Sequence, residues 1–220
     1  MLFRSEGSLD VSSPKGKGGT VELTAESIKL TSTSNINASG AKGGGTVLVG
    51  GDWQGSGSLP QAKSVSMAEG ALINASATRK GDGGKVVLWS DVKQTDSVTA
   101  AAGTIKVEAG NLGGNGGKIE TSGHDLRVDG VKVSTKAPKG KTGEWLLDPY
   151  DITISSGSAS NVTGTYTASG NSAIVNVTTL TTALSTANVT VSTGTSGSQT
   201  GNITVANAIS DSSANTLILD

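Results

Sequence analysis

The chain of 220 residues contains 32 Gly and 57 Ser or Thr, but only six aromatic residues and no Cys. So few large side chains exclude an ordinary compact core of this size, and the missing Cys excludes disulfides and thiolate metal sites. The net charge of −1, from 17 Lys and Arg against 18 Asp and Glu, lacks the basic excess expected of a nucleic-acid-binding protein. No apolar run approaches the ~20 residues of a membrane-spanning helix.

A glycine pair followed by an alternating apolar run (GG-x-V-x-L) recurs along residues 1–150. Its copies lie at Gly18–Leu23, Gly44–Val49, Gly83–Leu88, Gly116–Glu120 and, in degenerate form, Gly143–Leu147. The last glycines of successive copies are 26, 39, 33 and 26 residues apart. A second signature, of the type I-x-A-S, precedes each glycine pair, with copies that begin at Leu9, Ile36, Ile73, Val107 and Val131. Two linked signatures that recur five times predict stacked structural repeats.

Each repeat predicts short strands in which apolar residues alternate with Thr, Lys, Glu or Ser. One unit cannot bury its apolar face alone, whereas stacked units share a narrow core of Val, Ile, Leu and Ala. The irregular spacing favours an all-β fold, a right-handed parallel β-helix whose coils tolerate insertions, with residues 51–60 as the insertion in the longest repeat. Neighbouring strands are about 4.8 Å apart, so each coil of about 22–26 residues adds that height, and we expect a rod about 40–50 Å long.

Residues 151–220 contain 28 Ser or Thr and no Lys or Arg, and alternating runs predict that they continue the β-helix. The candidate strands are Asp151–Ile154, Ala173–Val177, Asn188–Val191, Gly201–Val205 and Asn215–Leu219. The i, i+4 pair Leu180 and Leu184 indicates a short helix near 178–186, against which four threonines count. We therefore divide the chain into β-helix repeats at 1–150 and a Ser/Thr-rich continuation at 151–220. Since both ends of the chain interrupt the repeat pattern, we expect an internal fragment, open at both ends.

Four motifs stand in a fixed order along the chain: Gly45–Gly55 (GTVLVGGDWQG), Ala71–Ala77 (ALINASA), Gly81–Asp91 (GDGGKVVLWSD) and Trp145–Ile152 (WLLDPYDI). This set resembles the filamentous-haemagglutinin-like large exoproteins, strongly over residues 7–155. The resemblance implies a secreted right-handed β-helix on the outer surface of a Gram-negative bacterium, exported by two-partner secretion through an outer-membrane transporter. The Asn-Pro-Asn-Gly-like motifs of the family's N-terminal secretion domain are absent, so we assign no export signal here.

Parallel β-helices also host polysaccharide lyases and hydrolases, which need acids clustered on one face. The nearest local set is Asp148, Tyr150 and Asp151 beside Glu144, and an Asp-Pro turn at the end of a strand is the preferred interpretation. The single His124 has no nucleophile motif around it, and we expect it in a solvated turn. We predict that the protein is not an enzyme, with no catalytic residues, no cofactor and no metal site.

Two sets of residues are candidates for carbohydrate chemistry. Trp53, Trp89 and Trp145 occupy similar repeat positions, which makes them candidates for glycan stacking, with packing in the core or a groove as the competing interpretation. Asn-x-Ser/Thr sequons are candidate glycosylation sites, although a chain this rich in Ser and Thr contains several by chance. They lie at Asn37, Asn74, Asn161, Asn176, Asn188 and Asn202.

We predict a structural shaft segment of a secreted surface adhesin. Stacked coils would project distal binding sites and make weak, repeated contacts with glycans or matrix proteins of host or neighbouring cells. One alternative is a β-helix polysaccharide lyase or hydrolase, which three or more carboxylates converging in one groove would favour. The other is the stalk of a contact-dependent toxin-delivery protein. We predict no nucleic-acid partner and no transmembrane segment.

Overall fold

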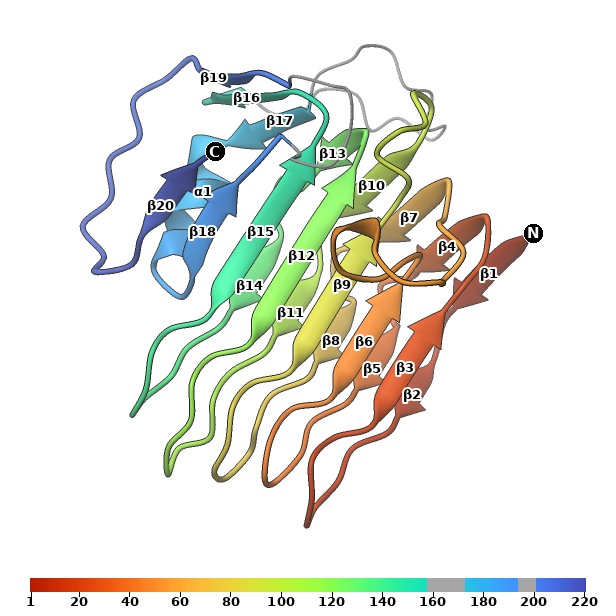
Figure 1. The fold of residues 1–220 in the computed structure, drawn as a ribbon, viewed down its shortest axis with the longest axis vertical. Coiled ribbons are helices and arrows are strands. Elements are labelled where there is room, and N and C mark those ends of the chain that lie inside the picture. Colours follow the sequence, from red (N-terminus) through yellow and green to blue (C-terminus); the bar gives the residue numbers. More distant parts are fainter. Residues whose placement is uncertain (158–172, 194–200) are drawn as a thin grey trace.

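The structure, a computed structural model, describes residues 1–157, 173–193 and 201–220 and contains three parallel sheets (Figure 1). The eight-stranded sheet contains, in order, β1 (Leu2–Ser5), β4 (Ser27–Leu30), β7 (Ser64–Met67), β10 (Val98–Ala101), β13 (Asp125–Arg127), β17 (Ala173–Asn176), β16 (Ile152–Ser155) and β19 (Ile203–Val205). The five-stranded sheet contains β14 (Lys132–Ser134), β11 (Thr104–Lys106), β8 (Leu72–Asn74), β5 (Asn35–Asn37) and β2 (Ser8–Asp10). The seven-stranded sheet contains β20 (Leu217–Leu219), β18 (Asn188–Val191), β15 (Glu144–Pro149), β12 (Lys118–Gly123), β9 (Lys85–Trp89), β6 (Thr46–Val49) and β3 (Thr20–Leu23).

The predicted parallel β-helix is confirmed. From β1 to β15 each coil contributes one strand to each sheet, and every strand pair is parallel, for example β3 with β6 and β6 with β9. In Figure 1 the chain climbs the front sheet, crosses the top and descends behind it while moving away from the N-terminus, which is the right-handed sense. No helix in the described part of the chain is long and apolar enough to cross a membrane.

The strand register confirms the glycine-pair repeat. Thr20 pairs with Thr46, Thr46 with Lys85, Lys85 with Lys118, and Lys118 with Glu144. These are the same steps of 26, 39, 33 and 26 residues that separate the glycine pairs. The longest step contains η1 (Trp53–Gly55), a 3-10 turn inside the predicted insertion.

The second signature is right in its first three copies and wrong by two residues in the last two. Leu9 pairs with Ile36 and Ile36 with Ile73, as predicted, but the next partners in this ladder are Ile105 and Val133. A shift of two residues keeps every side chain on the same face of the strand. The alternation of apolar and polar residues therefore could not reveal the error.

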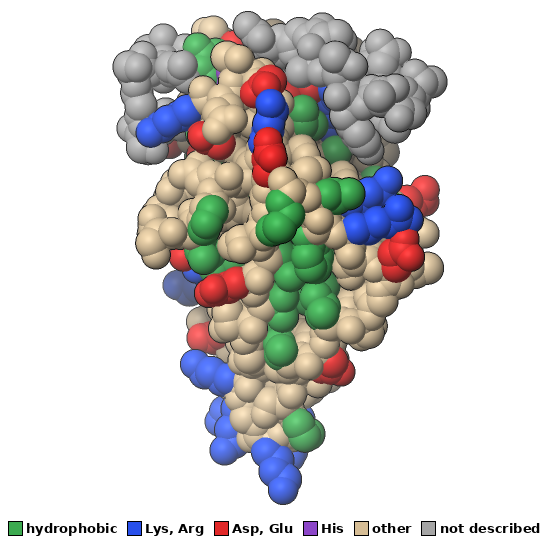
Figure 2. Space-filling model, turned by 90° about the vertical axis from the view of Figure 1, so that its right-hand side faces the viewer, with side chains coloured by type: hydrophobic (Ala, Val, Ile, Leu, Met, Phe, Trp, Pro, Cys, Tyr) green, Lys and Arg blue, Asp and Glu red, His purple; other side chains and the backbone are tan. Residues whose placement is uncertain are grey.

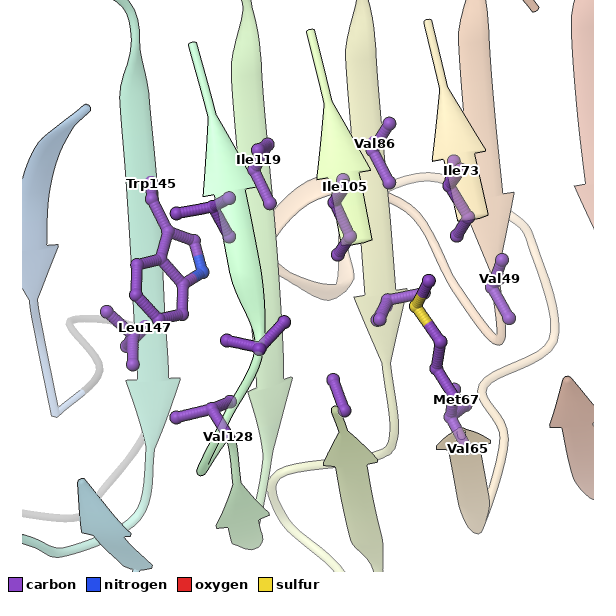
Figure 3. Packing of buried hydrophobic residues seen from close by; sticks show 14 of the residues in the cluster. Val49, Val65, Met67, Ile73, Val86, Ile105, Ile119, Val128, Trp145 and Leu147 are labelled. Atoms are coloured by element: carbon purple, nitrogen blue, oxygen red, sulfur yellow. The ribbon is translucent and has the colours of Figure 1, made fainter. Parts of the chain in front are cut away.

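The core is a thin column of inward-facing side chains from all three sheets (Figure 3). Aliphatic residues stack on residues of the same kind one coil away, as Ile73 does on Ile105, and both are fully buried. Trp145 of β15 is among the largest side chains of this core and is also fully buried; its indole Nε1 donates to Thr121 Oγ1 at 3.1 Å. A buried indole needs such a partner, because its unpaired N–H would carry a desolvation cost.

The regular pattern changes after Pro149. β17 lies between β13 and β16, so the spatial order of these strands departs from their order in the sequence. The helix α1 (Val177–Leu184) then packs against β14 and β18, at the position where a sixth strand of the five-stranded sheet would lie. Asn176 caps α1 by accepting the Thr178 backbone N–H at 2.7 Å. Leu180 and Leu184 are buried, so the i, i+4 pair faces the core.

The predicted 40–50 Å rod is wrong. The largest sheet, with eight strands, spans about 34 Å at ~4.8 Å per strand. The rod was overestimated because insertions and the segment between β15 and β18 add residues to coils without adding height. The molecule is longest across its coils, perpendicular to the stack (Figure 1).

Candidate functional site

The outer face of the seven-stranded sheet carries a small second apolar cluster beneath the η1 insertion. Leu48, Val87 and Trp89 point outward from β6 and β9, and Trp53 and Leu59 of the insertion pack against them. Trp89 Nε1 donates to Gln61 Oε1 at 3.0 Å. The insertion approaches so closely that a Cβ on its Gly51 or Gly55 would overlap the Trp89 ring. The insertion is thus a packed cover over this face.

Glu120 of β12 is the central polar residue under this cover. Its side chain points outward in the same row as Leu48 and Val87, yet the residue has no exposed surface. The Gln54 backbone N–H donates to Glu120 Oε2 at 2.8 Å, and Ser122 Oγ donates to Oε1, also at 2.8 Å. Gln54 has φ 52 and is the only non-glycine residue in the described ranges with positive φ. This left-handed turn is the backbone geometry in which its N–H reaches Glu120.

Two buried carboxyl groups of this region have raised pKa values. Burial raises the pKa of Glu120 to about 7; the hydrogen bonds from Gln54 and Ser122 oppose this shift, and the carboxylates of Asp148 and Asp52 add to it. Burial also raises the pKa of Asp148, on the neighbouring β15, to about 6. Burial thus favours the neutral form of both groups, against the usual behaviour of carboxyl groups near neutral pH.

Asp52 has the opposite environment at the edge of the cover. Its Oδ1 accepts from Lys85 Nζ at 2.8 Å and from the Trp53 backbone N–H at 2.6 Å. The hydrogen bond from Lys85 holds the pKa of Asp52 below its usual value. Lys118 Nζ lies 5.3 Å from the centroid of the Trp53 ring, within the range of a cation–π interaction. The contacts with Lys85 and Lys118 hold the exposed side of the insertion, and the hydrogen bond to Glu120 holds the side that faces the sheet.

The Glu120 carboxyl group binds the insertion through the Gln54 N–H, and because its pKa is raised to about 7, this contact depends on whether the group is protonated. Both oxygens of Glu120 accept hydrogen bonds and none of its surface reaches solvent, so a sugar cannot contact this carboxyl group in the structure described. Within residues 1–157, 173–193 and 201–220, no three His, Asp or Glu side chains converge in a way that could hold a metal ion.

The local acidic set predicted from the sequence is dispersed. Glu144 accepts from Thr190 Oγ1 at 3.0 Å, and Asp151 accepts from the Asn202 backbone N–H at 2.7 Å. Asp148 is buried, and β15 runs through Asp148 and Pro149, so the predicted Asp-Pro turn is wrong: the residues end a strand. Of this set, only Asp148 belongs to the Glu120 region.

The prediction for His124 is also wrong, because this residue is 5% exposed. Its Nδ1 lies 3.1 Å from the Val92 carbonyl oxygen, and its ring packs against Tyr150 with centroids 4.7 Å apart. Its Nε2 is buried without a hydrogen-bond partner in the described structure. His124 comes directly after the long strand β12 and contacts Val92 and Tyr150, so it does not lie in an open turn.

Comparison with known proteins gives a likeness to a solved structure. No protein-family model matches the chain, and no curated protein matches it. Among solved structures, the chain is similar to the HMW1 secretion domain from Haemophilus influenzae, with 29% sequence identity and a TM-score of 0.52. The likeness covers 67% of this chain and 38% of that one, so the chain spans well under half of the length of the solved domain.

The three tryptophans do not form one stripe. Trp145 points into the core, whereas Trp89 points outward from the same sheet and is 3% exposed under the insertion. Trp53 is half-buried in the insertion itself. Of the three, only Trp53 presents an appreciable surface to a glycan.

Five of the six sequons lie in the described residues, and Asn161 lies outside them. Each of the five asparagine side chains already makes hydrogen bonds. Asn37 and Asn74 accept the backbone N–H two residues ahead at matching corners of successive coils, and Asn176 caps α1. Asn188 accepts from the Thr216 backbone N–H at 3.0 Å, and the exposed Asn202 donates to Asp151. Glycosylation of these sites stays a prediction.

Sequence reasoning missed Glu120. Its place in an alternating strand predicts an exposed side chain, but the η1 insertion, which includes Gln54 66 residues earlier, packs over it. One signal was available: its row also contains Leu48, Val87 and Leu146, which are too apolar for a solvated face.

Proposed function

We propose that this chain is a structural β-helix segment of a secreted bacterial adhesin that reaches the cell surface through an outer-membrane two-partner secretion transporter. The observation that carries the proposal is the likeness, over two thirds of the chain, to a secretion domain that is 29% identical. The uninterrupted stack of coils between β1 and β15 supports it, since a solenoid of this kind is an extended scaffold.

The fold suits export as a linear chain. Each coil contacts mainly its neighbours, and backbone hydrogen bonds join successive coils in the strands and also in the turns, as between the Ala41 N–H and Ser13 O at 2.9 Å. A solenoid of this kind can add coils one after another as the chain emerges. On this proposal the mechanism is mechanical: the stack carries distal binding sites for glycans or matrix proteins of other cells.

The proposed role is non-enzymatic. The burial of Glu120 supports it, because the carboxyl groups with raised pKa values in the described residues, Glu120 and Asp148, are buried rather than exposed in an open groove. A β-helix polysaccharide lyase would need such acids to meet substrate. The alternative of a toxin-delivery stalk shares the same mechanical role and differs in what the stalk carries.

The neighbour's description as a secretion domain favours a second candidate function, recognition by the transporter itself. On that proposal the coils present the surface that the transporter engages during export. The two functions are compatible, but they respond differently to the loss of a coil.

Deletion of one whole coil tests the proposal. Removal of residues 20–45 from the gene in its native host joins Gly19 to Thr46, which occupies the register position of Thr20. The control deletion removes residues 20–32, half a coil, and so breaks the register. A shaft predicts that the whole-coil deletion is displayed and mediates cell attachment at about the wild-type level, while the half-coil deletion is lost to degradation.

Three outcomes are decisive. Lost display of the whole-coil variant, with the purified variant still folded, would favour transporter recognition over a shaft. Normal display with lost attachment would place binding in these coils and overturn the purely structural role. Depolymerisation of a polysaccharide by the purified wild-type chain, abolished in Glu120→Gln, would overturn the non-enzymatic proposal.

A further inference from the structure

One edge of the β-helix carries a concentrated positive charge that the net charge conceals. This edge consists of the five turns that lead from the five-stranded to the seven-stranded sheet, residues 13–18, 40–45, 77–84, 109–117 and 136–143; we call it the basic ridge. It contains eight basic residues and one acidic residue, Asp82. The basic residues are Lys15, Lys17, Lys42, Arg79, Lys80, Lys136, Lys139 and Lys141. In Figure 2 blue side chains gather at the narrow lower end of the molecule, where these turns lie (Figures 1 and 2).

These charges are exposed and uncompensated. All eight basic side chains are exposed, and none takes part in an ion pair among the described residues. The single carboxylate of the ridge, Asp82, accepts the Asn115 backbone N–H at 2.7 Å, and its one negative charge offsets at most one of the eight positive charges. Since successive coils are ~4.8 Å apart, the cation-bearing positions of the first three turns lie within one Debye length of about 8 Å at physiological salt, and their charges repel one another. A polyanion would relieve this repulsion.

The ridge is rigid at its tip. Backbone hydrogen bonds tie each turn to the next: the Lys42 N–H donates to Gly16 O at 2.9 Å, and the Lys80 N–H donates to Ala41 O at 3.1 Å. The Lys141 N–H donates to Asn115 Oδ1 at 3.0 Å. The backbone anchors of the cations are therefore fixed in a row, over five turns that span about 19 Å. Binding would cost little ordering of the chain.

The shape of the ridge favours a flat surface over a single polymer chain. The body tapers to this edge, so the cations lie on a convex strip rather than in a groove (Figure 2). The fourth turn has no cation, and its tip carries Leu112, which is 59% exposed between the basic residues of the turns on either side. Cations around an exposed apolar side chain are typical of proteins that bind an anionic lipid surface, because the cations meet phosphates while the apolar group enters the interface.

We propose that the basic ridge docks on a phosphate-bearing lipid leaflet, and specifically on one that contains lipopolysaccharide. Recognition of an anionic surface follows from the ridge alone. The choice of lipopolysaccharide over a phospholipid rests on the proposed function, which puts the protein at the bacterial outer surface.

The test is vesicle co-sedimentation of the purified chain. Three vesicle types are compared: phosphatidylcholine with lipopolysaccharide, phosphatidylcholine with phosphatidylglycerol, and phosphatidylcholine alone. The test variant carries Lys17→Gln, Lys42→Gln and Lys80→Gln. The matched control carries Lys29→Gln, Lys63→Gln and Lys93→Gln, three exposed lysines in or next to the eight-stranded sheet at the opposite end of the coils. Urea unfolding checks that both variants fold.

We expect salt-sensitive binding of the wild-type chain to lipopolysaccharide vesicles and none to phosphatidylcholine alone. At roughly fivefold per lysine, the test variant should bind about 100-fold more weakly, and the control variant within about twofold of the wild type. A third variant, Leu112→Ser, should weaken vesicle binding several-fold without changing binding to soluble heparin, since only a lipid interface accepts an apolar side chain.

The proposal is overturned by equal losses in the two lysine variants, which would show that net charge alone drives binding. Tighter binding to heparin than to vesicles, with no effect of Leu112→Ser, would identify a soluble polyanion as the ligand instead. Binding to phosphatidylglycerol but not lipopolysaccharide would overturn the choice of leaflet. None of these outcomes changes the result of the coil deletion, so the lipid-docking proposal and the proposed function can fail separately.

Discussion

Glu120→Gln should remove part of a pH dependence of stability that the structure imposes. The pKa of Glu120 rises from 4.5 to about 7 on folding, chiefly because burial penalises the carboxylate. With about 1.36 kcal/mol for each pKa unit, ionising this group costs the folded state about 3 kcal/mol. Because the folded pKa is the higher one, the stability is fully present below about pH 4.5 and is lost as the pH rises through about 7.

The assay is urea unfolding at constant ionic strength between pH 5 and 8.5. The wild-type free energy of unfolding should fall with increasing pH, and Asp148, whose pKa also rises on folding, should add to the fall at the acidic end. Glu120→Gln should match the wild type within about 1 kcal/mol at pH 5 and exceed it by about 2–3 kcal/mol at pH 8.5. The Gln side chain can still accept the Gln54 N–H.

The matched control is Glu22→Gln on β3. Glu22 occupies the same outward row as Glu120, three strands away, but is exposed. This variant should follow the wild-type pH profile. A wild-type stability that does not fall between pH 5 and 8.5, or an equally steep fall in Glu120→Gln, would refute the account of the covered carboxyl group.

Three further substitutions test the packing. Gly116→Ala should destabilise the chain by at least about 3 kcal/mol in urea unfolding, because a Cβ there would overlap the Thr135 carbonyl oxygen. The control Gly7→Ala, where the space is open, should change stability by less than about 0.5 kcal/mol. Similar effects of the two substitutions would contradict the close stacking of turns. Trp145→Ala should lower the free energy of unfolding by about 3–5 kcal/mol in the same assay, and Trp53→Ala by less than half as much, since only Trp145 is fully buried. The reverse order would be incompatible with the described core. Asn176→Ala should cost about 1 kcal/mol through loss of the α1 cap and lower the helical signal in circular dichroism, and an unchanged spectrum would argue against α1.

The sequence predicted the coils well where a residue type has one role. Glycine pairs recur because turns of successive coils nearly touch, so their spacing translated directly into the strand register. The alternating runs predicted the faces of strands but not their absolute register, since Ile105 and Val107 both face the core. The segment after Pro149 was harder, because its Ser and Thr serve turns, strands and α1 equally well.

The candidate site was beyond the sequence for a different reason. The burial of Glu120 depends on an insertion that folds back over β12, and periodicity within β12 contains no information about that cover. His124 was misplaced for the same reason, since Val92 and Tyr150 enclose it from other coils. Such contacts between coils decide whether an outward position is solvent-exposed or buried.

The alignment of lysines in the basic ridge depends on the glycine content of the chain. Its lysines are spread over more than 120 residues, so a count of charges along the chain finds only neutrality. The register aligns them, and the register depends on glycine: a Cβ on Gly44 would overlap the Ala75 carbonyl oxygen of the next coil, and Gly83 meets Val107 in the same way. Turns that stack this tightly leave room inside only for small side chains such as Ala41, which is buried, whereas the long lysine side chains are exposed. The glycine content that allows a thin core therefore also puts the lysines in a row at the edge.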